Sequence, residues 1–146
     1  MNFKIRNKTF YDVFLGLLIK EGNKLQAKKL LDTSFLIVSK QAKLPINHIL
    51  LKLVLYLNSF VEIKKIKSKR STHFVPFPLS INRKSYLMSR WIISSVNEDK
   101  RKISFSLKLS EEILSIILKK SAKSLTKKNL NFKQSLQNKS NTHFRW

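Results

Sequence analysis

The densest group of chemically active side chains is a run of cations near the middle of the chain. Residues 64–71 read Lys-Lys-Ile-Lys-Ser-Lys-Arg-Ser, which places five cations in eight positions. The stretches 63–97 and 113–146 contain no Asp or Glu, so no carboxylate close in sequence offsets their cations. Ammonium and guanidinium groups gathered in this way neutralise phosphates. We expect these two stretches to meet a polyanion most closely.

The whole chain carries the same imbalance. Its 146 residues include 30 Lys and Arg against 8 Asp and Glu, a formal net charge of +22. Solubility of a small domain needs a net charge of only about 2–8. Nucleic acid is therefore the first candidate partner, and an anionic membrane surface is the second.

Side chains for catalysis, metal binding and nucleotide binding are scarce. The chain has no Cys, which excludes disulfides, thiol nucleophiles and Cys-ligated zinc. Its three His are far apart in sequence, and its two Gly cannot form a phosphate-cradling loop. We predict that the chain is not an enzyme and has no metal site and no cofactor.

Hydrophobic periodicity predicts a mainly α fold with about six helices in a single domain, residues 1–146. Apolar residues recur at helical spacing over about 10–18, 27–38, 46–57, 87–96 and 109–117. A basic N-terminal arm of about residues 1–8 should precede a capping box at Thr9–Asp12, and Gly22 should end the first helix in the left-handed conformation. The weakly apolar segment of about 122–146 predicts a last helix that orders only on its partner.

The periodicity changes to that of a β-hairpin at about residues 60–80. Val61 and Ile63 alternate with polar residues, and apolar residues alternate again across Pro76 and Pro78. Two prolines exclude a central strand, because each lacks the N–H that a ladder needs. The simplest structure is a two-stranded ribbon with free edges, and its basic outer part should project from the helical bundle.

The segment 61–91 resembles the hairpin and following helix of the universal small-subunit ribosomal protein seven family. The matching residues, as they stand here, are Val61-Glu-Ile-Lys64, Ser71-Thr72, Val75-Pro76, Arg83, Leu87 and Arg90-Trp91. The ending His143-Phe-Arg-Trp146 is similar to the family's terminal signature, and residues 18–27 are similar to its first helix–turn–helix. The resemblance covers about residues 9–146, and residues 102–114 look closest to plant-type and protist mitochondrial members. Where the family typically has a Gly pair at the hairpin tip, this chain has Lys69-Arg70.

The resemblance implies a structural protein of the small ribosomal subunit, with a helical domain and a protruding ribbon. It implies binding to the 3′ major (head) domain of small-subunit rRNA, nucleation of head assembly, and a place near the exit tRNA site and the mRNA path. The expected partners are small-subunit rRNA, other small-subunit proteins, exit-site tRNA and mRNA, with no membrane and no homo-oligomer. A composition typical of AT-rich codons favours a mitochondrial, organelle-encoded protein.

Thirteen cations are the candidate RNA-binding residues. They are Lys64, Lys65, Lys67, Lys69 and Arg70 on the ribbon, then Arg83, Lys84 and Arg90, then Lys127, Lys128 and Arg145, with Arg6 and Lys8 in the N-terminal arm.

Two other functions compete with this interpretation. A DNA-binding helix-turn-helix protein would use residues 9–40, but it leaves the basic ribbon and the chain's ending unexplained. A membrane-surface protein would use cationic amphipathic helices. A membrane span is not expected, because no apolar run reaches the roughly 18–20 residues that it needs.

Overall fold

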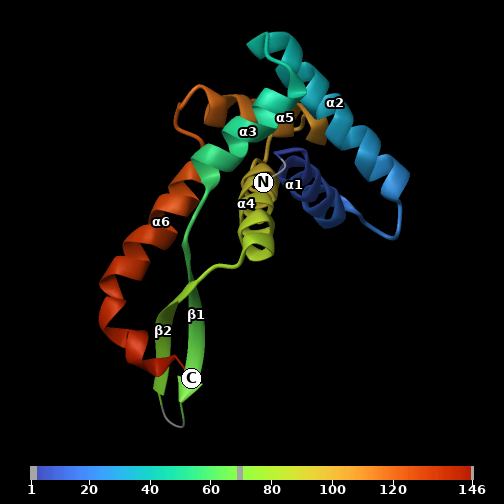
Figure 1. Ribbon diagram of the computed structural model, residues 1–146. Helices are drawn as coiled ribbons and strands as arrows, with labels where there is room; N and C mark the ends of the chain where they lie inside the picture. The colour runs from blue at the N-terminus through green and yellow to red at the C-terminus, as the bar shows by residue number, and fades with distance from the viewer. Residues whose placement is uncertain (1–2, 69–70, 146) are drawn as a thin grey trace.

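The computed structural model describes the backbone of residues 3–68 and 71–145 and the side chains of residues 10–67 and 71–145. The helices are α1 (Phe3–Leu18), α2 (Lys24–Ala42), α3 (Ile46–Leu57), α4 (Ile81–Asn97), α5 (Phe105–Ile117) and α6 (Lys123–Gln137), followed by a short 3-10 helix, η1 (Lys139–Phe144). The strands are β1 (Val61–Ser68) and β2 (Ser71–Pro78). A helical body carries the two-stranded ribbon as a projection, and α6 runs beside that ribbon (Figure 1). The predicted mainly α fold with a β-hairpin is confirmed.

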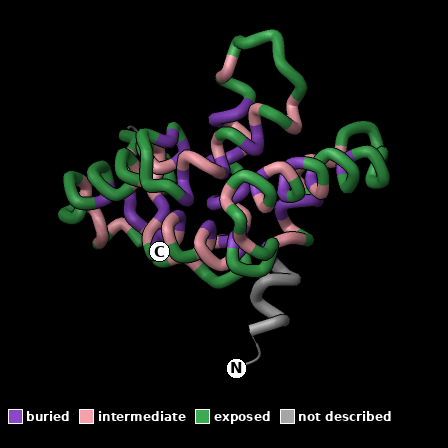
Figure 2. The backbone as a smooth tube through the Cα atoms, turned by 90° about the horizontal axis from the view of Figure 1, so that it is seen from above, coloured by how far each residue is buried: buried purple, intermediate pink, exposed green. Residues whose placement is uncertain are grey.

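The core lies between α1, α2, α3, α4 and α5. Phe14, Leu31, Leu53, Ile92 and Ile113, one from each helix, are fully buried. The rings of Phe14 and Phe35 meet edge to face, with centroids 6.4 Å apart. Buried positions lie along the inner sides of the helices (Figure 2), as a 3.6-residue apolar period requires. None of the helices in the described ranges is both long and apolar enough to cross a bilayer.

Helix α1 begins earlier than the sequence indicated. It starts at Phe3, so the segment expected as an arm forms its first turns, and Thr9 lies inside the helix rather than at its cap. No Pro or Gly interrupts residues 3–9, so the backbone continues its helical hydrogen bonds past the capping motif. Helix α1 ends at Leu18, four residues before Gly22, which adopts the predicted left-handed conformation with φ 76°.

The ribbon accommodates its prolines through its register. Pro76 lies opposite Ile63, and Pro78 lies opposite Val61. The amide of Leu79 donates to the carbonyl of Phe60 at 3.0 Å, which identifies their pair as hydrogen-bonded. In an antiparallel ribbon, hydrogen-bonded pairs alternate with pairs that are not hydrogen-bonded, so Pro78 and Pro76 both belong to pairs of the second kind. The nitrogens of both prolines therefore point away from the partner strand, and no ladder bond is lost.

The edges of the ribbon are not free, contrary to the prediction. The side-chain amide of Asn131 in α6 donates to the carbonyl of Val61 at 2.7 Å, on the outer edge of β1. On the outer edge of β2, Asn141 donates to the carbonyl of Phe74 at 3.2 Å, and Arg145 donates to that of Pro76 at 2.7 Å. The C-terminal segment thus supplies donors to outward-facing carbonyls that the two strands leave unpaired.

Candidate nucleic-acid interface

The ribbon presents its described cations to solvent. Lys64, Lys65 and Lys67 of β1 are all exposed, and none of them forms a salt bridge with a described carboxylate. Their neighbours include aromatic rings: the Lys64 amine lies 5.1 Å from the ring centroid of Phe77. Lys69 and Arg70 lie outside the described residues. The arrangement is a projecting set of amines next to aromatic side chains.

An ion pair joins the base of the ribbon to the helical body. Arg83 of α4 donates two hydrogen bonds to the carboxylate of Glu62 in β1, at 2.8 Å and 2.5 Å. These bonds hold the pKa of Glu62 below its ordinary value of 4.5, against an opposing contribution from burial. The guanidinium also lies 4.8 Å from the ring centroid of Tyr86. Arg83 therefore fixes the base of the ribbon to α4.

Helix α4 adds two further cations near that junction. Arg90 is exposed, whereas the neighbouring Trp91 is buried. The Lys84 amine lies 4.5 Å from the ring centroid of Phe60, a side chain that is itself 70% exposed. Both cations are placed where an anion approaching the ribbon base could meet them.

The predicted cluster on α6 is turned inward. Lys127 contacts the hydroxyl of Ser94 on α4 and forms a salt bridge at 2.7 Å with Glu98, the residue directly after α4. Lys128 donates to the carbonyl of Tyr56 at the end of α3, at 2.5 Å. Burial lowers the pKa of Lys128, because the charged amine loses hydration. These two amines connect α6 to the helical body.

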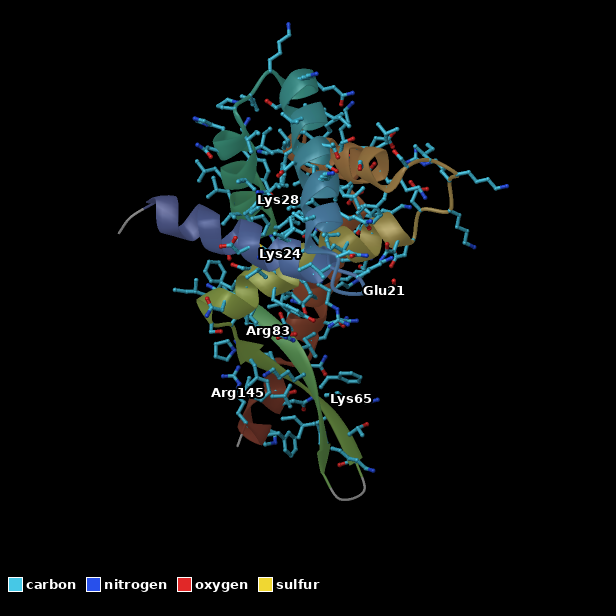
Figure 3. The ribbon with its side chains drawn as sticks, turned by 90° about the vertical axis from the view of Figure 1, so that its right-hand side faces the viewer. Glu21, Lys24, Lys28, Lys65, Arg83 and Arg145 are labelled. Carbon is cyan, nitrogen blue, oxygen red and sulfur yellow. The ribbon has the colours of Figure 1, made fainter. Side chains whose placement is uncertain are left out.

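The remaining predicted cations have different positions. Arg145 lies beside the ribbon, with its guanidinium carbon 5.8 Å from the ring centroid of Phe77. In Figure 3, Arg145 and Lys65 lie on opposite sides of the ribbon. Arg6 and Lys8 belong to the first turns of α1, and their side chains lie outside the description.

Asp99, Glu111 and Glu112 of the helical body have partners within it. Arg101 bridges Asp99 and Glu111, at 2.5 Å and 2.6 Å, and its hydrogen bonds hold the pKa of Asp99 well below its usual range. Glu112 of α5 accepts from both the amide and the hydroxyl of Ser124, at the start of α6. Among the side chains that the structure describes, no group of three His, Asp or Glu is placed to hold a metal ion.

A second cationic surface, on α2, is not among the predicted binding residues. Lys24 and Lys28 lie one helical turn apart near the start of α2, and both are exposed, as is Lys20 in the preceding turn. This surface lies on the helical body, well away from the ribbon (Figure 3). The sequence did carry a sign of this surface, because these lysines lie off the apolar stripe of α2. They also lie in or next to residues 18–27, the helix–turn–helix that is part of the family resemblance.

Comparison with known proteins identifies the family. The model of the family "Ribosomal protein S7p/S5e" matches residues 3–139. The small ribosomal subunit protein uS7 of Wigglesworthia glossinidia brevipalpis is 29% identical, over 96% of this chain and 88% of that protein. The mitochondrial protein uS7m of Reclinomonas americana is 27% identical, over 91% of this chain and 82% of that protein. That of Gallus gallus is 32% identical over 59% of this chain, which is 37% of its own length. The chain is therefore a ribosomal protein and belongs to the S7p/S5e family.

Proposed function

We propose that this chain is a structural protein of the small ribosomal subunit that binds small-subunit rRNA in the 3′ major (head) domain and nucleates head assembly. The observation that carries the proposal is the projecting ribbon with the exposed side chains of Lys64, Lys65 and Lys67, in a chain of this family with a net charge of +22. Folded RNA is recognised mainly through shape, phosphates and 2′-hydroxyls, which suits a broad basic surface. The family match supports this function over the DNA-binding alternative.

Counterion release supplies the binding free energy. Each phosphate that a Lys or Arg neutralises frees condensed cations from the RNA, so affinity depends steeply on salt. The exposed amines of Lys64, Lys65 and Lys67, together with Lys69 and Arg70, form the main binding group in this proposal. Lys84, Arg90 and Arg145 extend it, and Arg6 and Lys8 contribute from the start of α1.

Lys127 and Lys128 take a subordinate part in the proposal. Their amines already contact Glu98 and the carbonyl of Tyr56. An RNA phosphate would have to displace these partners, which costs part of the free energy of binding. Lys127 and Lys128 therefore reach RNA only at the expense of an existing contact within the protein.

The proposal also covers location and neighbours. The ribbon would lie near the exit tRNA site and the mRNA path, and other small-subunit proteins would pack against the helical body. A mitochondrial ribosome is the proposed setting. The likeness to the mitochondrial uS7m proteins supports it, and so does an amino-acid composition typical of AT-rich codons. Bacterial uS7 proteins have a similar identity to this chain.

Sedimentation and salt dependence test the proposal together. In a fractionated mitochondrial lysate, the protein should sediment with the small subunit. For the purified full chain on a head-domain rRNA fragment, replacing Lys64, Lys65 and Lys67 by Gln should reduce the slope of log affinity against log salt by about 2–3. A native protein free of ribosomal particles, or an affinity that does not change with salt, would contradict the proposal.

A further inference from the structure

One face of the ribbon's outer half combines two kinds of group. Side chains alternate between faces along a strand, and directly paired residues share a face. Lys65 is paired with Phe74, and Lys67 is paired with Thr72, so these four side chains lie on one face. All four are exposed. We name Lys65, Lys67, Thr72 and Phe74 the outer ribbon face.

The opposite face is already in contact with the chain's own C-terminal segment. The ring of His73 stacks on Phe144, with centroids 4.1 Å apart and planes inclined by 12°. Val75 is fully buried, and the Arg145 guanidinium lies near Phe77. The aromatic rings on that face therefore have partners within the protein.

Phe74 differs from those rings. It is 48% exposed, and the Lys65 amine lies 5.8 Å from its ring centroid. An exposed phenyl ring contributes nothing to phosphate binding, and leaving its apolar area in water is unfavourable. The open area of the ring is a flat apolar surface beside two amines.

That combination fits an unpaired nucleotide. A base outside a helix offers a π-face that stacks on an aromatic ring, and its flanking phosphates attract amines. A duplex buries its base faces and would meet only the amines. No carboxylate belongs to the outer ribbon face, and Glu62, on the opposite face, is bound by Arg83.

We propose that Phe74 is a stacking platform for an unpaired RNA base, with Lys65 and Lys67 binding the adjacent phosphates. The ribbon then prefers single-stranded RNA over duplex RNA. This inference rests on the proposed function and specifies the form of RNA that the ribbon takes. Phe74 supplies the preference for single strands, whereas the lysines supply affinity for either form.

The test compares Phe74→Leu with Phe74→Tyr in the full chain. The probes are an unstructured RNA of about ten nucleotides containing 4-thiouridine and a duplex RNA of equal charge, and affinity is measured by fluorescence anisotropy over a range of salt. Phe74→Leu should weaken single-strand binding about tenfold and leave the salt slope and duplex binding unchanged. Phe74→Tyr should stay within about twofold of the unmodified chain. Phe132→Leu is the matched control, because Phe132 is 58% exposed on α6, and it should change nothing.

Photo-crosslinking locates the contact. Cleavage after Arg70 and Arg83 releases residues 71–83 as one peptide, which should carry the crosslinked nucleotide. Full single-strand affinity in Phe74→Leu, an equal loss on duplex RNA, or crosslinks only outside this peptide would overturn the stacking role. In each of those cases, salt-dependent binding through Lys65 and Lys67 would leave the proposed function standing. A full chain that binds neither RNA would instead contradict the proposed function.

Discussion

Two lysine pairs that look alike in sequence have opposite environments in the fold. Lys65 and Lys67 on β1 are exposed, whereas Lys127 and Lys128 on α6 are partly buried against α4 and α3. Both pairs lie in stretches without acidic residues. Local charge density therefore does not determine which amines remain available to a partner.

The difference arises from what each element packs against. The ribbon projects from the body (Figure 1), and Lys65 and Lys67 on it are both exposed. Helix α6 lies against the ends of α3 and α4, where a free carbonyl and the carboxylate of Glu98 face it. Three of its large apolar side chains are exposed instead: Leu130, Phe132 and Leu136 are each more than half exposed. A long, flexible Lys side chain can satisfy such buried polar groups where a Leu cannot.

The largest expected effect is on the free energy of unfolding, when one lysine of each pair is replaced by Glu. Lys128→Glu should lower the free energy of unfolding by about 2–3 kcal/mol, because it places a carboxylate next to the Tyr56 carbonyl and removes a donor. Lys67→Glu should change it by less than about 0.5 kcal/mol. Urea denaturation of the two variants measures both values. Helix propensity does not confuse the result, since Glu and Lys are nearly equal in helices.

RNA affinity of the same two variants should show the reverse order. Lys67→Glu should weaken rRNA binding more than Lys128→Glu does, when both are measured well below their unfolding temperatures. A Lys128→Glu variant as stable as the unmodified chain, and the weaker binder of the two, would contradict the structural role of Lys128 and the binding role of Lys67.

The junction between ribbon and body should show an intermediate effect that depends on pH. Glu62→Gln should lower the free energy of unfolding by about 1 kcal/mol at pH 7, since Arg83 is partly exposed and its ion pair is partly screened. The folded-state pKa of Glu62 lies below its ordinary 4.5, so its stabilising contribution is present above that pH and is lost as the pH falls through the folded-state value.

Unfolding measured from pH 7 to pH 3 checks this prediction. The difference between Glu62→Gln and the unmodified chain should shrink below about pH 4.5. Glu111→Gln is the control, because Glu111 is 49% exposed in its pair with Arg101, and it should cost less. A constant difference across the whole range would contradict the assigned role of the ion pair.

The smallest expected effect lies at the C-terminal contact with β2. Arg145→Ala removes the donor to the Pro76 carbonyl and should cost about 0.5–1 kcal/mol. Hydrogen exchange over residues 138–145 should become faster, because the segment loses one of its attachments to the ribbon. Lys139→Ala, at an exposed position in η1, should leave both quantities unchanged. Equal behaviour of the two variants would show that Arg145 does not hold the segment.

The helical body could be predicted well from particular residues. The stripe of Ile49, Leu50, Leu53 and Leu57 predicted α3, and all four side chains are buried. Pro76 and Pro78 predicted a two-stranded ribbon, because a third strand on β2 would need the N–H groups that they lack. These predictions are correct because both depend on residues close together in the sequence: the helical period on residues three or four apart, and the strand on the missing N–H of each proline.

The start of α6 could not be predicted in the same way. The N-cap residue before α6, Ala122, makes no side-chain hydrogen bond to the helix, and Glu112 of α5 accepts the hydrogen bonds of Ser124 instead. The partners of the Asn131, Asn141 and Arg145 side chains are likewise backbone carbonyls about seventy residues away in sequence. A hydrogen bond between distant segments leaves no periodic signal in either of them.

The sequence by itself determined the excess of cations, the helical periods, the hairpin and the family resemblance, because each depends on composition or on neighbours along the chain. Only the tertiary structure decided which cations stay exposed, since packing brings the Tyr56 carbonyl and Glu98 to Lys128 and Lys127 but brings no carboxylate to Lys65 or Lys67 within the described residues. An amine contacts a phosphate of another molecule at the lowest cost where the fold has not already given it a partner.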